Sequence, residues 1–250
     1  MMNSIKDKET YIWYGILAIV LIALAFNIYS FFDFKKIDVK QSNNVMGQRL
    51  SMMSLTDFDK AKARQIMDKN NDGRCDFCGM PVEMCIDSGE MECGMNPDAK
   101  TGKLGSQHIH ADWRIYLDGK QFDFTQLGDR HERQMHGDKS IKDTSAFMHI
   151  HPAQNPEKAG DVIHMHATGI TFSLFFESLG MQLTNDCLII SDSEKYCNSV
   201  NKKIKMFVNG KENNEFGNYV FNDLDKILLT YGEGSIQDQL KSITDFAKVH

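Results

Sequence analysis

The sequence predicts an α+β protein with an N-terminal transmembrane helix, a small cysteine-rich module, and a mostly antiparallel β domain with a few helices. Three observations carry this prediction. An uncharged apolar stretch opens the chain, four of the six cysteines lie between residues 75 and 93, and Asp-Gly and Asn-Gly pairs interrupt alternating apolar and polar segments. We expect an anchor segment (1–32), a stalk (33–55), a cysteine-rich module with its linker (56–106), and a histidine-rich domain (107–250).

Composition narrows the class of partner. The 250-residue chain has a formal charge of −6 and a pI near 5.8, and no basic stripe occurs along it. This pattern argues against a nucleic-acid partner. The even number of cysteines, six, suits disulfides if the domain leaves the cytoplasm, and the 15 methionines are a high count.

The stretch from Tyr11 to Phe32 contains no charged residue. A helix of this length, at about 1.5 Å per residue, spans about 33 Å, enough to cross a bilayer. A cleaved signal peptide ending near Ala23-Leu24-Ala25 is the alternative, but the apolar run continues to Phe32 and favours a retained anchor. Lysines flank both ends, so they do not decide the orientation. The paired cysteines favour a single-pass protein of the cell membrane, with its C-terminal domain extracytoplasmic.

The module begins with a short helix predicted over residues 56–67 and capped by Thr56. Hard oxygen ligands then alternate around Gly73, at Asp68, Asn70, Asp72 and Asp76. This is the first half of an EF-hand-type calcium loop, and it resembles the shorter calcium loops of thrombospondin-type repeats. Gly79 stands where the bidentate Glu belongs. An Asn/Asp-rich turn that ends the helix is therefore an equal alternative.

Four cysteines of the module have the spacing of metal ligands: Cys75, Cys78, Cys85 and Cys93. Four thiolates suit one zinc ion, and the neighbouring methionines would suit Cu(I), which prefers soft sulfur. Two disulfides are an equal alternative, and a redox-active Cys-x-x-Cys pair is another. For Cys187 and Cys197, which flank a predicted turn, a structural disulfide is the plain interpretation.

Eight of the nine histidines fall between residues 108 and 166. Six of them form three His-x-His pairs: His108 and His110, His149 and His151, His164 and His166. Side chains two residues apart on a strand share a face, so each pair can present two imidazoles to one ion. The alternative is that each histidine is a surface or core residue that makes its own hydrogen bond and binds no metal. Three repeats of the same pattern make this alternative less favoured. His131 and His136, in a charged segment, are expected at the solvated surface.

The first pair opens a hairpin with Asp118-Gly119, a strong type I′ turn signal. Alternation along this strand places Asp112 on the face of the two histidines, so Asp112 is a candidate metal ligand or a partner that orients one. The same register places Arg114 opposite Asp123 and predicts a cross-strand ion pair.

A second hairpin over residues 147–166 carries the other two His-x-His pairs. If its strands pair, four imidazoles converge, because neighbouring Cβ atoms lie only about 4.5–5.5 Å apart. The remaining predicted elements are a helix over 171–180 with Thr171 as N-cap, a hairpin over 203–216, a strand over 225–232, and an amphipathic helix from Ser235 to the end.

Several motifs together resemble a known family: HIHADWRIYLDGK, MHIHP, VIHMHATGITFSLFFESLGMQL, KMFVNGK and DKILLTYG. This resemblance covers roughly residues 107–232. It is to an uncharacterised family of membrane-anchored prokaryotic proteins, of archaeal or candidate-phylum type, with one N-terminal span and a His-rich extracytoplasmic domain. Some members carry a loose protein-disulfide-isomerase label. The resemblance implies the architecture and the ligand-like histidines but supplies no reaction.

Four functions follow as hypotheses. The first is a membrane-anchored protein that captures, senses or delivers a transition metal, copper before zinc. The second is a metal-dependent oxidoreductase or hydrolase at the same cluster, with Asp112, Arg114 and Glu132 as candidate acid–base groups. The third is a thiol–disulfide oxidoreductase or isomerase acting through Cys75 and Cys78. The fourth is a structural cell-surface domain that a metal ion stabilises. The sequence identifies no protein partner.

Overall fold

The computed structural model describes residues 54–123, 145–150 and 160–249. The chain divides into two units, Met1–Met52 and Met53–His250, and all described residues belong to the second. The predicted anchor over residues 11–32 lies outside the described residues. Within the described ranges, no helix is long and apolar enough to cross a membrane.

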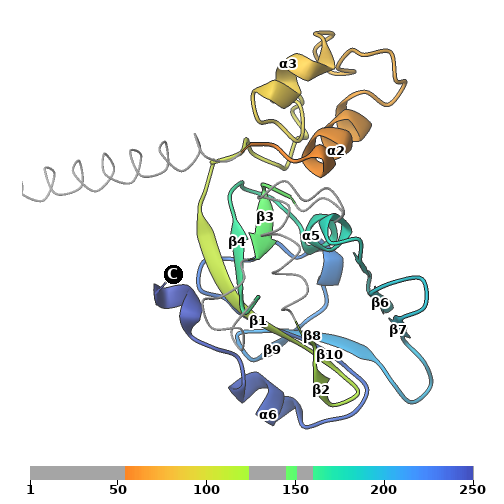
Figure 1. The fold of residues 1–250 in the computed structure, drawn as a ribbon, viewed down its shortest axis with the longest axis vertical. Helices are drawn as coiled ribbons and strands as arrows, with labels where there is room; N and C mark the ends of the chain where they lie inside the picture. Colours follow the sequence, from red (N-terminus) through yellow and green to blue (C-terminus); the bar gives the residue numbers. More distant parts are fainter. Residues whose placement is uncertain (1–53, 124–144, 151–159, 250) are drawn as a thin grey trace, which may run out of the picture. The chain divides into compact units, whose positions relative to one another are not determined.

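The second unit is an α+β fold with mostly antiparallel strands, as the sequence predicts (Figure 1). Its helical elements are α2 (Asp57–Met67), α3 (Val82–Asp87), α5 (Phe172–Ser178), η2 (Phe216–Asn218), α6 (Ile236–Lys241) and η3 (Phe246–Val249). Its strands are β1 (Ile109–Leu117), β2 (Lys120–Gln121), β3 (Met148–Ile150), β4 (Val162–Met165), β5 (Gln182–Leu183), β6 (Cys187–Ile189), β7 (Lys195–Cys197), β8 (Ile204–Val208), β9 (Lys211–Asn213) and β10 (Lys226–Tyr231).

The main sheet has the strand order β3-β4-β1-β10-β8-β9, and β2 pairs with the C-terminal end of β1. Strand β1 is its longest described strand, and it pairs antiparallel with β4 on one edge and parallel with β10 on the other. The β1–β10 pair is the one parallel pair among the described strands. A smaller sheet, β5-β6-β7, carries the disulfide between Cys187 and Cys197, which confirms that prediction.

Both faces of β1 are covered. On one face, Trp113 packs against the α5 aromatics Phe172, Phe175 and Phe176, with ring centroids 5.5 to 6.3 Å apart. On the other face, a second apolar cluster joins Phe207 and Leu228 of the sheet to Ile243, with residues of α6 packed against it. The histidines of β1 lie on this second face, because they alternate with Trp113.

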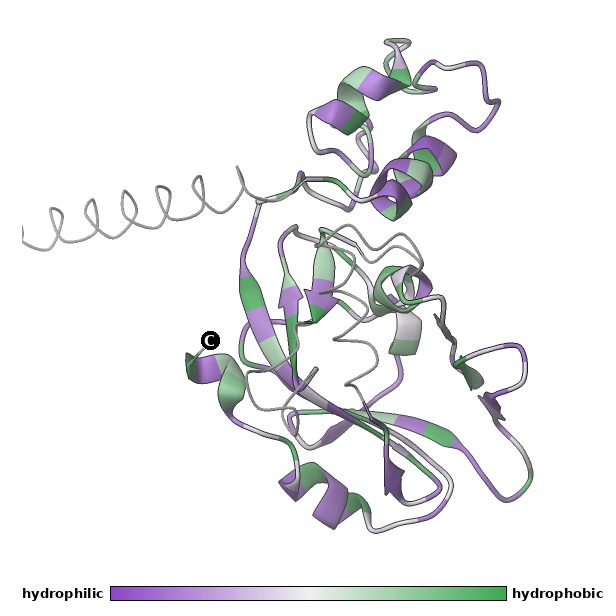
Figure 2. Ribbon diagram, viewed as in Figure 1, coloured by the Kyte–Doolittle hydropathy of each residue, from purple (hydrophilic) through white to green (hydrophobic). Residues whose placement is uncertain are grey.

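The local signals of the sequence are confirmed. Asp118 and Gly119 have positive φ angles of 48° and 78°, as a type I′ turn requires, and Asn209 and Gly210 repeat the geometry at the 203–216 hairpin. The side chains of three residues cap helices by accepting a backbone N–H of the first turn: Thr56, Thr171 and Ser235. Figure 2 shows that α2 and α6 each carry both apolar and polar residues.

The C-terminal segment differs from the single helix expected after Ser235. Helix α6 ends at Lys241, and a separate 3-10 turn, η3, follows. The segment after α6 has partners in the sheet. The Thr244 hydroxyl and the N–H groups of Phe246 and Ala247 donate to the buried carboxylate of Asp112 on β1, so these contacts hold η3 against the sheet.

Candidate functional site

Three neighbouring strands place five imidazoles on one face of the main sheet: His108, His110, His149, His164 and His166 (the histidine cluster). His164 on the central strand β4 lies directly opposite His110 of β1 and directly opposite His149 of β3. The three side chains therefore form a row across the sheet. His108 and His166 lie one step further along the strands, next to the paired residues Ile109 and Met165.

The rings of this cluster are in contact. The ring centroids of His110 and His164 are 4.6 Å apart, those of His108 and His166 are also 4.6 Å apart, and those of His149 and His166 are 4.9 Å apart. His149, His164 and His166 are buried, whereas His108 and His110 are half-buried. The strands thus bring the imidazoles together, with three of them shielded from solvent and two partly exposed.

The nitrogen atoms form two groups that could each hold an ion. His108, His110 and His164 make one group, and His149, His164 and His166 make the other; within each group the candidate ligand atoms lie within 4.8 Å of one another. His164 belongs to both. Three neutral imidazoles are a common ligand set for Zn, Cu, Ni or Fe. The convergence of His149, His164 and His166 expected from the second hairpin is therefore confirmed.

Some predicted site residues lie outside the described residues. They are His151, the fourth imidazole expected from the second hairpin; Glu132, a candidate acid–base group; and His131 and His136, expected at the surface. Predictions about them remain predictions.

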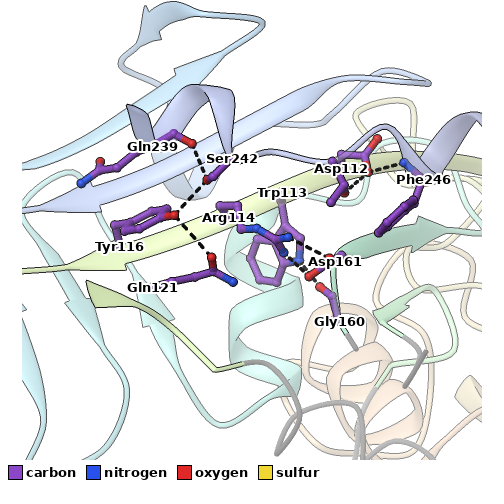
Figure 3. A network of polar contacts seen from close by, with 11 residues as sticks. Asp112, Trp113, Arg114, Tyr116, Gln121, Gly160, Asp161, Gln239, Ser242 and Phe246 are labelled. Atoms are coloured by element: carbon purple, nitrogen blue, oxygen red, sulfur yellow. Dashed lines mark hydrogen bonds and ion pairs between the residues drawn. The ribbon is translucent and has the colours of Figure 1, made fainter. Parts of the chain in front are cut away.

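Asp112, a candidate ligand or partner that orients one, is not among the described residues whose ligand atoms converge. Its Oδ1 accepts hydrogen bonds from the Phe246 amide (2.9 Å; Figure 3) and the Thr244 hydroxyl (2.5 Å). Its Oδ2 accepts one from the Ala247 amide (3.2 Å). Both carboxylate oxygens are engaged, and the residue is 2% exposed. Asp112 therefore fixes the C-terminal segment over the sheet.

Arg114 also has a structural partner other than the one expected. It forms a buried, bidentate ion pair with Asp161, whose second hydrogen bond, from Nη2 to Oδ2, is 2.8 Å long (Figure 3). The register expected for this hairpin is confirmed where Leu117 pairs with Lys120, and the predicted pair of Arg114 with Asp123 stays a prediction. Asp161 comes immediately before β4, and the long-range pairing of β4 with β1 brings it to Arg114. No local sequence signal could reveal this contact, except that an acidic residue directly precedes a buried strand.

The four cysteines of the module also converge: Cys75, Cys78, Cys85 and Cys93 (the cysteine cluster). Their sulfur atoms all lie within 4.8 Å of one another, with Cys75 and Cys93 buried and the other two half-buried. The sequence predicted that these residues are crosslinked or metallated, and the structure brings all four together as free thiols.

The thiols differ in acidity. The backbone N–H of Met80 hydrogen-bonds the sulfur of Cys78 and lowers its pKa. Burial, reinforced by the neighbouring thiols, raises the pKa of Cys85 to about 12 and that of Cys93 to about 11. These two thiols keep their protons at neutral pH unless a cation replaces them, so metal binding here releases protons.

The oxygen-rich segment after α2 is organised by hydrogen bonds to its own backbone. Asp68 accepts from the amides of Asp72 (3.0 Å) and Gly73 (2.9 Å), and Asp76 accepts from the amide of Lys69 (3.0 Å). Asp72 accepts from the Arg74 amide at 2.8 Å, and Asn70 accepts from the Asp72 amide at 3.0 Å. These contacts favour a helix-ending turn, and a calcium ion here stays a prediction.

The sequence analysis missed Asp59, which is buried on α2 and connects the cysteine-rich module to the strand that carries His149. Its carboxylate accepts a hydrogen bond from the Ala146 amide (2.7 Å) and one from the Ser145 hydroxyl (2.5 Å), just before β3. Burial raises the pKa of Asp59. The one available signal was its position three residues after Thr56, where an acidic residue completes a capping box.

Comparison of this chain with protein-family models, with curated proteins and with solved structures finds no match.

Proposed function

We propose that this protein is a membrane-anchored, extracytoplasmic binding protein that holds a transition metal, copper before zinc, in the histidine cluster. The observation that carries the proposal is the pair of three-imidazole groups that share His164. The role would be capture, sensing or delivery of the ion. The apolar stretch over residues 11–32 and the Cys187–Cys197 disulfide support the anchor and the compartment.

The ligand chemistry supports copper first. Imidazole nitrogen binds both copper and zinc well, but a given nitrogen site binds Cu²⁺ more tightly than Zn²⁺. The two overlapping groups also suit an ion that must leave again. An ion held by His108, His110 and His164 needs to exchange only two ligands to be held by His149, His164 and His166.

The surroundings support binding over catalysis. An enzyme at this cluster would need an acid or base beside the open coordination position. Of the candidates that the structure describes, Asp112 holds the C-terminal segment and Arg114 is paired with Asp161. Both are thus used structurally. A metal-dependent oxidoreductase or hydrolase is the alternative at the same residues.

The test is metal analysis of the full chain, purified in detergent without a polyhistidine tag, beside a His164→Ala variant. The matched control is a His131→Ala/His136→Ala double variant, which removes two histidines that we do not count as ligands. We expect about one equivalent of copper or zinc in the histidine cluster of the parent and of the control, counted in addition to any metal held by the cysteine cluster. Because His164 belongs to both groups, we expect His164→Ala to weaken binding by about 100-fold or more.

Either of two results would contradict the proposal. One is a parent protein that, after growth in copper- and zinc-replete medium, holds no more metal than the His164→Ala variant. The other is equal metal affinity in His164→Ala and in the control. A lowered melting temperature in His164→Ala with metal still bound would instead indicate that His164 serves the fold.

A further inference from the structure

The cysteine cluster is built by three short pieces of chain. Cys75 and Cys78 come from one tight turn, Cys85 comes from the middle of α3, and Cys93 comes from the loop beyond it. All six distances between the four sulfur atoms are 4.8 Å or less. The sulfur atoms therefore enclose a small common centre.

The turn that carries the first two cysteines is closed by its own backbone. The amide of Cys75 donates to the Met80 carbonyl, and the amide of Gly79 donates to the Cys75 carbonyl, both at 2.8 Å. Gly79 has a φ angle of 71°, a conformation that glycine adopts at no steric cost. The amides of Met80 and Met95 also hydrogen-bond the sulfurs of Cys78 and Cys93. Amides that point at sulfur stabilise thiolates, which are the form that binds a metal.

We propose that Cys75, Cys78, Cys85 and Cys93 form a tetrathiolate zinc site that holds the cysteine-rich module together. Four sulfurs at about 2.3 Å from a zinc ion lie roughly 3.8 Å from one another, which fits the observed cluster. A disulfide instead requires two sulfurs at about 2.05 Å. The same structure pairs Cys187 with Cys197 as a disulfide and leaves these four as free thiols.

The neighbouring methionines favour zinc over Cu(I). Met80, Met84 and Met95 lie beside cysteines in the sequence, but their side chains are 47%, 56% and 75% exposed. These three face solvent, whereas Met91, the fourth methionine near the cysteines, is 1% exposed and belongs to the apolar core. Four thiolates in a closed set are typical of structural zinc, whose preferred geometry is tetrahedral.

The module needs such a crosslink. Its regular structure consists of two helices of 11 and 6 residues, with one isolated β-bridge between Arg74 and Pro81. A segment of about 50 residues buries little apolar surface of its own, and metal ions or disulfides commonly add to the stability of such segments. The bound ion also fixes the end of α3, where Gly89 accepts a hydrogen bond from Leu104 (2.8 Å). The next residue, Gly105, donates to the His166 carbonyl, so the module supports the strand end that carries His166.

The experiment uses the full chain in detergent, loaded with Co²⁺ in place of zinc, because four thiolates around Co²⁺ give intense sulfur-to-metal charge-transfer bands. We expect these bands in the parent and in His164→Ala, and we expect a Cys187→Ser/Cys197→Ser control to retain them. We expect Cys75→Ser/Cys78→Ser to lose them together with one equivalent of zinc. This design tests the cysteine cluster independently of the histidine cluster. If one proposal is wrong, the metal bound at the other site can still be measured.

A conservative variant guards against simple misfolding. Cys85→His keeps a zinc ligand at a half-buried position, so we expect it to retain one equivalent of metal and to shift the cobalt bands as one sulfur is replaced by nitrogen. An unshifted spectrum would overturn the proposal. The proposal would also be overturned if the four cysteines resist alkylation in the denatured, unreduced protein, because this would mean two disulfides. A parent protein that carries iron in place of zinc would overturn it as well.

Discussion

The histidine cluster and the cysteine cluster bring comparable numbers of ligands together by different means. The histidines stand on β1, β3 and β4, whose backbones are hydrogen-bonded to one another through the sheet. The cysteines stand on a tight turn, a helix of 6 residues and a loop. A sheet fixes the distances between its side chains whether or not an ion is present. In the module, by contrast, we propose that the bound ion itself supplies a large share of the order. The fold therefore forms the histidine site, whereas metal binding at the cysteine site would stabilise the fold of the module.

The largest effect should come from removing metal altogether. We expect a strong chelator to lower the stability of the module by several kcal/mol, on the order of what zinc supplies to small metal-dependent domains. Amide hydrogen exchange in α2 and α3 should rise by at least tenfold, roughly, while exchange in β1 and β10 stays slow. If chelation raises amide exchange equally in the module and in the sheet, the contrast between the two sites is wrong, because both would then stabilise the fold.

The second effect concerns the support of the sheet beneath the histidines. Arg114→Met leaves Asp161 buried and without its cation, which we expect to cost about 3–5 kcal/mol of unfolding free energy. Urea unfolding measures it, and an Arg114→Met/Asp161→Leu double variant should recover much of the loss. If the double variant is as unstable as the single one, Arg114 contributes through packing rather than through the ion pair.

The variant Asp112→Asn tests whether Asp112 binds the metal or only holds the C-terminal segment against the sheet. Asparagine keeps one acceptor oxygen, but its amide nitrogen cannot accept the hydrogen bonds now made to the other carboxylate oxygen, so we expect a loss of about 1–3 kcal/mol. Metal content should be unchanged. Lost metal together with unchanged stability would restore Asp112 as a ligand.

The smallest effect lies in the C-terminal segment. Hydrogen bonds from Lys248 and Lys226 lower the pKa of the exposed Asp245 to about 2, from an ordinary value of 3.8. Its stabilising contribution is therefore present above pH 4 and is lost as the pH falls through about 2. We expect Asp245→Asn to lower stability slightly at neutral pH and to match the parent near pH 2, as measured by thermal unfolding. A difference that persists at pH 2 would contradict the ion pairs as its source.

The sequence was most informative where structure is local. The turns at Asp118-Gly119 and Asn209-Gly210 and the N-caps Thr56 and Ser235 depend on a few adjacent residues, and they were predicted correctly. The His-x-His spacing also predicted a shared face, because alternation along a strand is a local property.

The missed features all depend on distant parts of the chain. Asp161 meets Arg114 only because β4 pairs with β1. The position of η3 depends on a carboxylate more than 100 positions earlier, that of Asp112. Periodicity does not report which strands become neighbours. The sequence therefore gave candidate ligands for the site but could not separate the ligands from the residues that support them.

The parallel pairing of β1 with β10 has a consequence for how the chain is made. The five described histidines of the cluster have all been synthesised once residue 166 is complete, whereas β10 begins only at Lys226. At about 5–20 residues per second, the second edge of β1 waits several seconds for its partner. During that interval the nascent chain already has its ligands, but it also exposes an unpaired strand edge, the feature through which newly made proteins most readily aggregate.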